Sequence, residues 1–151
     1  MFKRVVVGGT FNVVHAGHRE LIETAFEIAE EVVVGLSSDE FANRFRTFNT
    51  RPFETRKKDI EKYISGFKRP YRIVEINDIY GDATTDVRMD ALVVSEETLL
   101  RAQEINAIRF KKGLEKLNII VVPIVVGKDG HPISCDRIEA GEIDLEGKSL
   151  K

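Results

Sequence analysis

Short apolar runs alternate with longer amphipathic stretches along the whole chain. The runs are rich in β-branched residues and mostly continuous, a pattern typical of parallel strands that are covered on both faces. They predict five strands, over Arg4–Val7, Val32–Leu36, Tyr71–Ile76, Ala91–Val94 and Ile119–Val126. Pro123 interrupts the last run, and because proline has no backbone N–H to donate, it predicts an edge strand or a bulge there.

The stretches between these runs carry apolar residues at helical spacing. In the first, Gly17–Glu31, apolar residues recur every three or four positions, which predicts a helix with one buried face. A second helix is expected to begin at Pro52, since proline suits the first turn of a helix. A third is expected after Ser95, a good N-terminal capping residue that is followed by two acids.

The order of these elements predicts the fold. Alternation of strands and helices with short connections is typical of an α/β protein with right-handed crossovers. We therefore expect a Rossmann-like, doubly wound parallel sheet of about five strands with helices on both faces. The sequence contains no linker-like tract, internal repeat or low-complexity segment, so residues 1–151 are predicted to form a single domain.

Composition narrows the class of protein. Hydrophobic residues make up 42% of the chain, which argues against disorder, and the longest apolar run, Ile119–Val126, is far shorter than the ~20 residues that span a bilayer. A single cysteine, Cys135, excludes an internal disulfide framework and an all-cysteine metal site. The first residues lack the apolar core of a secretory signal. We therefore expect a cytoplasmic protein that does not bind a membrane.

The distribution of charge bears on the ligand. There are 23 basic and 25 acidic residues, a formal net charge of −2, which disfavours a general nucleic-acid-binding protein. One stretch is nevertheless strongly basic, with Glu54 as its single acid among Arg44, Arg46, Arg51, Arg56, Lys57 and Lys58. Such a stretch suits a small anion, although a solvated helix face explains it equally well. An RNA-binding surface fits poorly, because only three phenylalanines in this stretch offer stacking for bases.

The loop after the first predicted strand carries the strongest candidate chemistry. In doubly wound sheets ligands bind at the carboxyl ends of the strands. Here the loop has the sequence GGTFNVVHAGH, in which the glycines allow close backbone approach and Thr10 offers a hydroxyl. His15 and His18 share one face at a helix start, where donors suit a polyphosphate. Two other interpretations stay open: the histidines cap the helix without a ligand, or they bind zinc with a third ligand from His131, Cys135 or an acid.

The same loop resembles a known signature. GGTFNVVHAGH is similar to the T-F-D-x-x-H-x-G-H signature of the nucleotidylyltransferase superfamily, and residues 132–138, PISCDRI, resemble its second signature, I-S-S-T-R-I. Segments 51–57, 93–98, 105–109 and 141–144 resemble the archaeal type of phosphopantetheine adenylyltransferase within that superfamily. The resemblance covers essentially the whole chain.

The resemblance implies an activity and a set of site residues. The family transfers the adenylyl group of ATP to 4′-phosphopantetheine, giving dephospho-coenzyme A and pyrophosphate in coenzyme A biosynthesis. By resemblance, catalysis falls to His18, His15 and Thr10, and ATP is bound by Gly8, Gly9, Thr10, Phe11, His15, His18, Ser134 and Arg137. The phosphate of the acceptor would meet Arg44, Arg46 and Arg109. Mg²⁺ would be held through the nucleotide phosphates and not directly by the protein.

Three departures from the signatures leave alternatives open. Asn12 stands where the first signature has aspartate, and Cys135 and Asp136 replace two hydroxyl residues of the second. The carboxylate of Asp136 would repel the phosphates, bind magnesium or cap a helix, and the choice between ATP and CTP stays open with it. A nucleotidylyltransferase acting on glycerol phosphate or FMN, and a non-catalytic nucleotide-binding module, are the alternatives. The oligomeric state also stays open, and a homo-oligomer is compatible with the sequence.

Overall fold

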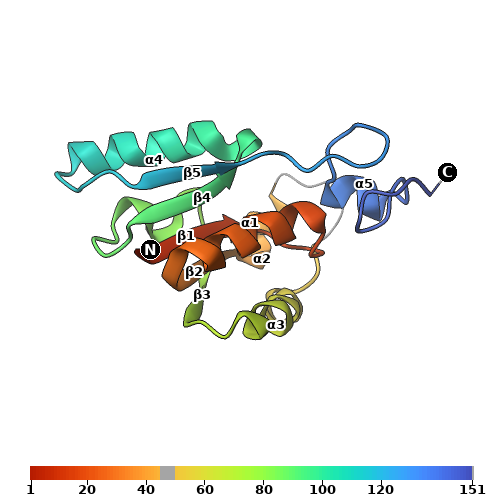
Figure 1. The fold of residues 1–151 in the computed structure, drawn as a ribbon, viewed down its shortest axis with the longest axis horizontal. Coiled ribbons are helices and arrows are strands. Elements are labelled where there is room, and N and C mark those ends of the chain that lie inside the picture. The colour runs from red at the N-terminus through yellow and green to blue at the C-terminus, as the bar shows by residue number, and fades with distance from the viewer. Residues whose placement is uncertain (45–49, 151) are drawn as a thin grey trace.

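The strands form one parallel sheet. The computed structural model describes residues 1–44 and 50–150, and its strands lie in the order β3-β2-β1-β4-β5 (Figure 1). Their bounds are β1 (Phe2–Gly9), β2 (Ala29–Ser37), β3 (Tyr71–Ile76), β4 (Ala91–Ser95) and β5 (Asn118–Val122). All five predicted strands are thus confirmed, as is the Rossmann-like α/β fold.

Helices connect the strands. Five α-helices are described, namely α1 (Ala16–Ile28), α2 (Asp39–Asn43), α3 (Phe53–Ile64), α4 (Leu99–Lys111) and α5 (Cys135–Glu139). Three short 3₁₀ turns accompany them, namely η1 (Ser65–Phe67), η2 (Gly81–Thr84) and η3 (Glu96–Thr98). None of the helices in the described ranges is long and apolar enough to cross a membrane.

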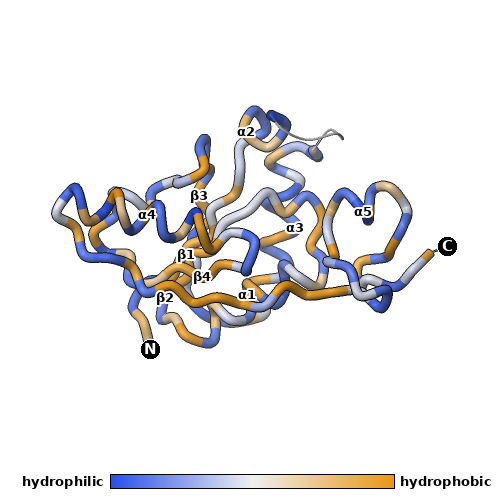
Figure 2. The backbone as a smooth tube through the Cα atoms, turned by 90° about the horizontal axis from the view of Figure 1, so that it is seen from above, coloured by the Kyte–Doolittle hydropathy of each residue, from blue (hydrophilic) through white to orange (hydrophobic). Residues whose placement is uncertain are grey.

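The sheet is covered on both faces. Val5 and Val7 of β1 belong to a buried cluster with the inner faces of α1 and α3. Val6, which points to the opposite face, belongs to a second cluster with Ala102 and Ile105 of α4. The continuous apolar runs of the strands follow from this arrangement, because alternate residues enter different cores. Figure 2 shows hydrophobic stretches along these strands and hydrophilic ones in many of the connections.

The first helix and the last strand both end earlier than the sequence-based expectation. The first helix ends at Ile28 and not at Glu31, because Ala29 already pairs with Phe2 in the sheet. The last strand ends at Val122, one residue before Pro123, and lies at an edge of the sheet as the proline predicts.

The chain after β5 folds back over the amino-terminal loop. The Ala16 N–H donates to the carbonyl of Leu145 at 3.1 Å, and Arg19 of α1 forms an ion pair with Glu146. Within the described residues, neither apolar cluster of the sheet extends beyond Val122. The segment that contains α5 therefore lies outside the core of the sheet, beyond its carboxyl edge (Figure 1).

Candidate active site

A cavity of about 580 Å³ opens at the carboxyl end of the sheet. The strand order reverses between β1 and β4, and this is where ligands bind in doubly wound sheets. One part of the cavity wall comes from the end of β1, the loop after it and the start of α1, through Gly8, Gly9, Thr10, His15 and His18. Another comes from the start of α5, through Ser134, Cys135 and Asp136. The structure therefore brings the two signature segments to one site.

The buried side chain of Phe11 supports the loop after β1. Its side chain is buried and its backbone has φ = 49°, a strained conformation for a residue that is not glycine. The ring lies edge-on to His18, with 4.8 Å between ring centroids. A Cβ at Gly9 would lie 3.2 Å from the Phe11 ring, so a side chain there would press on it. Phe11 was expected to bind ATP, but its side chain packs under the loop and does not line the cavity.

His15 caps α1. Its Nδ1 accepts hydrogen bonds from the backbone N–H groups of Gly17 at 3.0 Å and His18 at 3.4 Å, so the proton of the neutral ring sits on Nε2. Burial lowers the pKa of His15 to about 4, and the Arg19 cation acts in the same direction. Glycine is required at position 17, since a Cβ there would lie 2.9 Å from the His15 ring. His15 is therefore a neutral N–H donor at neutral pH.

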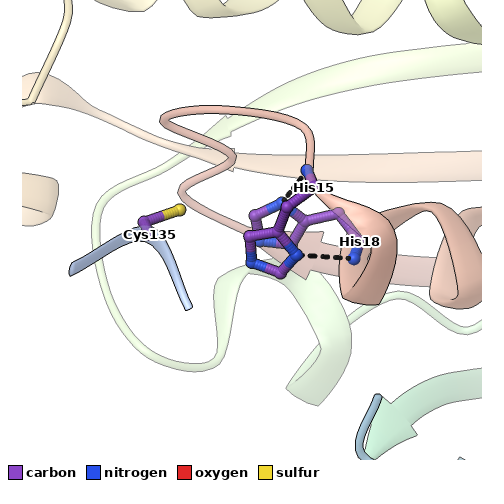
Figure 3. A group of neighbouring side chains, drawn as sticks. All are labelled: His15, His18 and Cys135. Atoms are coloured by element: carbon purple, nitrogen blue, oxygen red, sulfur yellow. Dashed lines mark hydrogen bonds between the residues drawn. The ribbon is translucent and has the colours of Figure 1, made fainter. Parts of the chain in front are cut away.

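His18 carries its proton on the other nitrogen. Its Nδ1 lies 2.9 Å from the carbonyl of Val13, which only accepts, and 3.5 Å from the His15 N–H. The shorter contact places the proton on Nδ1 and leaves a lone pair on Nε2. The two imidazoles are stacked, with 3.7 Å between centroids and 17° between planes (Figure 3). The histidine pair thus offers one donor and one acceptor, and a second donor when His18 is protonated.

The second signature segment begins α5. Ser134 caps this helix by accepting from the Arg137 N–H at 3.2 Å, and Asp136 is exposed beside it. Arg137 was expected to hold ATP phosphates, yet its guanidinium does not line the cavity. It pairs with Asp129 and Glu142 and donates to the Pro132 carbonyl at 2.8 Å. These carboxylates hold its guanidinium outside the cavity lining and raise its pKa.

The three arginines predicted for the acceptor phosphate have different positions. Arg44 is exposed and lies over the ring of Phe41, which lines the cavity, with 5.9 Å from its guanidinium carbon to the ring centroid. Arg46 lies outside the described residues. Arg109 is only 2% exposed and donates to the carbonyls of Ala83 and Asp86 at 2.9 and 2.8 Å. These bonds hold the guanidinium in the protein interior, and the contact of Arg109 with phosphate stays a prediction.

Asn12 joins the first signature segment to α5. Its Oδ1 accepts from the Arg51 N–H at 2.8 Å, while its amide nitrogen donates to the carboxylate of Glu139 in α5. An ionised aspartate, the usual residue of the signature, has no hydrogen to donate to that carboxylate. The departure at position 12 is thus matched by a partner that requires an amide.

Sequence reasoning missed a buried arginine behind the loop. Arg56 is fully buried and donates to the carbonyls of Thr10 and Ser37, both at 2.9 Å. It also forms an ion pair with Asp39 at 2.9 Å. Arg56 therefore fixes the ends of β1 and β2 relative to each other. The sequence does indicate its burial, because Arg56 precedes the buried Ile60 by about one helical turn and therefore lies on the same face of α3.

Comparison with known proteins places these features in a family. Residues 6–140 match the family model described as cytidylyltransferase-like. The chain is 42% identical over 150 residues to the phosphopantetheine adenylyltransferase of Methanothermobacter thermautotrophicus, covering 99% of this chain and 91% of that one. It is also 42% identical to a bifunctional phosphopantetheine adenylyltransferase/NTP phosphatase of Thermoplasma volcanium, covering 97% of this chain but 44% of that one.

A solved structure shows the same architecture. A crystal structure of a protein of unknown function from Archaeoglobus fulgidus superposes with a TM-score of 0.71 at 33% identity. The match covers 79% of this chain and 88% of that chain.

Proposed function

Because the chain belongs to the cytidylyltransferase-like family and, within it, to the phosphopantetheine adenylyltransferases, we infer that it transfers the adenylyl group of ATP to 4′-phosphopantetheine. An oxygen of the acceptor phosphate attacks the α-phosphorus, and the bond from that phosphorus to the bridging oxygen breaks. The products are dephospho-coenzyme A and pyrophosphate. The observation that supports this reaction best is the stacked pair His15 and His18 facing a cavity at the reversal of strand order.

The reaction needs positioning and charge stabilisation more than a base. The acceptor is a phosphate monoester whose second pKa is ~6, so at neutral pH its oxygen carries no proton to remove. Charge builds up on the α-phosphate and on the leaving pyrophosphate, where donors are most effective. We propose that His15 donates through Nε2–H in its neutral form, and that His18 donates through Nε2 when protonated. Thr10, Ser134 and the backbone at Gly8 and Gly9 complete the proposed phosphate contacts.

Magnesium fits this site through the nucleotide. Mg²⁺ takes oxygen ligands and is usually held by substrate phosphates with one or two carboxylates. Asp136 is an exposed carboxylate that lines the cavity beside Ser134, so the residues present are compatible with such a cation. When bound, the cation offsets the charge of the triphosphate. Asp136 either contributes to this binding or repels the phosphates, and titration of Asp136→Thr with ATP and Mg²⁺ distinguishes the two.

The rest of the cavity suits a long acceptor. The floor of this cavity is the face of the sheet that packs against α4, and it presents apolar side chains such as Val6, Val33 and Val74. We propose that the pantetheine arm lies along this floor. Its phosphate would then point toward the signature loops, with Arg44 near the cavity wall at Phe41.

The assignment is tested by pairing nucleotides with acceptors. The purified protein is given Mg²⁺ with ATP or CTP and, in turn, phosphopantetheine, glycerol phosphate or FMN, while pyrophosphate release and product mass are measured. We expect turnover with ATP and phosphopantetheine and a product of the mass of dephospho-coenzyme A. Turnover only with CTP, or only with FMN, would overturn the substrate assignment and leave the superfamily unchanged. No turnover with any pair would favour a non-catalytic nucleotide-binding module.

A further inference from the structure

Three metal-ligating side chains meet on the wall of the cavity. One ligand atom from each of His15, His18 and Cys135 lies within 4.8 Å of the other two. Figure 3 shows the Cys135 sulfur directed toward the stacked rings. His15 and Cys135 are 6% and 7% exposed, so the group is shielded from bulk solvent yet borders the cavity.

This donor set favours one class of cation. Imidazole nitrogen together with thiolate sulfur suits Zn²⁺ and similar cations, whereas Mg²⁺ prefers oxygen. Tetrahedral zinc with bonds of ~2.0 Å to nitrogen and ~2.3 Å to sulfur needs donors roughly 3.3–3.5 Å apart. The widest pair must therefore close by at most ~1.5 Å, and at least one of the stacked imidazoles must also turn, because a ring nitrogen binds a metal in the plane of its ring.

The two histidines differ in how readily each can bind a metal. His18 donates its Nδ1 proton to the Val13 carbonyl, which places the lone pair of the ring on Nε2 and is the usual arrangement of metal-binding histidines. His15 uses its Nδ1 lone pair to cap α1, so it binds a metal through Nε2 only if its proton moves to Nδ1 and the capping bonds are given up. In this geometry Cys135 and His18 are therefore better suited to bind a metal than His15 is.

We propose that Cys135, His18 and His15 form a binding site for a thiophilic divalent cation such as Zn²⁺, and that a cation bound there keeps the ATP phosphates out of the cavity. On binding, a metal–sulfur bond replaces the S–H bond of Cys135 and the proton leaves to solvent. The cation site stands independently of the proposed reaction. The competition between the bound cation and ATP, in contrast, rests on the position proposed above for the ATP phosphates.

Cobalt titration of the reduced protein tests the site itself. Co²⁺ reports on thiolate ligation through a sulfur-to-cobalt charge-transfer band and on tetrahedral geometry through its visible bands. We expect saturation at one equivalent, loss of the charge-transfer band in Cys135→Ser, and at least tenfold weaker binding in His18→Gln. His15→Asn, which keeps a good capping residue, should weaken binding less than His18→Gln.

The third histidine supplies the matched control. His131 is exposed and does not belong to the cluster, so His131→Gln should leave the cobalt spectrum and affinity unchanged. Thermal unfolding of each variant establishes that it is folded. A charge-transfer band that persists in Cys135→Ser, binding that does not saturate near one equivalent, or equal weakening in His131→Gln would overturn the proposed site.

Equilibrium dialysis tests the competition. Binding of labelled ATP with Mg²⁺ is measured while a chelator buffer fixes free Zn²⁺. At saturating Zn²⁺ we expect the Kd for ATP to rise at least tenfold in the wild-type protein and to stay constant in Cys135→Ser. An unchanged wild-type Kd would overturn the competition while leaving the cation site intact. No adenylyl transfer combined with a positive cobalt result would reject the proposed function and not the cation site.

Discussion

At the scale of single residues, the two signature histidines differ in what their rings offer to a ligand. His15 holds its proton on Nε2 because its Nδ1 caps α1, and His18 holds its proton on Nδ1 because of the Val13 carbonyl. In a neutral stacked pair, only His15 donates toward the cavity. A protonated His18 would donate there as well, and such a donor contributes most where negative charge increases during the reaction.

Replacing His18 should therefore affect turnover more than binding. In His18→Ala we expect kcat to fall by ~10²-fold or more, as for loss of a donor to a developing oxyanion, with a smaller change in KM for ATP. Steady-state kinetics with varied ATP separates the two constants. A change confined to KM would make His18 a binding residue, and full activity with a lowered melting temperature would make it a helix cap.

His15 should make the protein less stable as the pH falls. Its pKa is about 4 in the folded state against an ordinary 6.5, so the unfolded chain binds the extra proton first. Stability from this residue is complete above the unfolded pKa and is lost as the pH drops from 6.5 toward 4, by roughly 2–3 kcal/mol.

The measurement is the free energy of unfolding by denaturant between pH 4 and pH 7. His15→Asn, which caps α1 without titrating, should flatten the dependence, and His131→Gln should not. Equal slopes in the wild-type protein and in His15→Asn would show that carboxylates alone cause the pH dependence.

At the scale of elements, the site depends on contacts between segments that are far apart in the sequence. Asn12 of the first loop contacts Glu139 of α5, and Arg56 of α3 holds the carbonyls of Thr10 and Ser37. These contacts place the loop after β1 between a helix that precedes β3 and a helix that follows β5. The geometry of the loop is therefore a property of three elements, not of its own sequence alone.

Restoring the signature residue at position 12 should destabilise the fold. In Asn12→Asp a buried carboxylate replaces the amide beside Glu139, and two adjacent carboxylates disfavour their ionised forms. We expect a loss of about 1–3 kcal/mol in the free energy of unfolding. The double variant Asn12→Asp with Glu139→Gln should recover most of it, because the new amide at position 139 donates to the new carboxylate at position 12. A neutral single variant, or a double variant no more stable than the single one, would contradict this pairing.

At the scale of the whole molecule, the sheet and the completed site are separable. Neither apolar cluster extends beyond Val122 in the described chain, whereas Ser134, Cys135 and Asp136 of the cavity come from the segment that folds back over α1. A variant that ends at Val126 should therefore keep the far-ultraviolet circular dichroism of the α/β sheet but lose ATP binding in calorimetry. An unfolded truncated chain would show that the returning segment is needed for the fold, and one that binds ATP normally would remove α5 from the site.

A feature of this molecule could be predicted where the residues that determine it lie close together in the sequence. The strand Val32–Leu36 and the loop with His15 and His18 were predictable because their apolar runs and signature residues are contiguous. Arg109 was predicted to meet a phosphate, yet its side chain is buried, and two of the carbonyls that it binds lie 23 and 26 residues away in the chain. Buried arginines satisfied by backbone carbonyls leave no pattern of paired charges in the sequence.

The return of the chain after β5 has a consequence for synthesis. Chains emerge from the ribosome amino terminus first, and domains begin to fold in that order. The five strands are complete once Val122 has emerged, while Ser134 and the contacts of α5 with the first loop follow later. A growing chain can thus build its sheet before its nucleotide site exists, and the competence to hold ATP arises only after α5 has emerged.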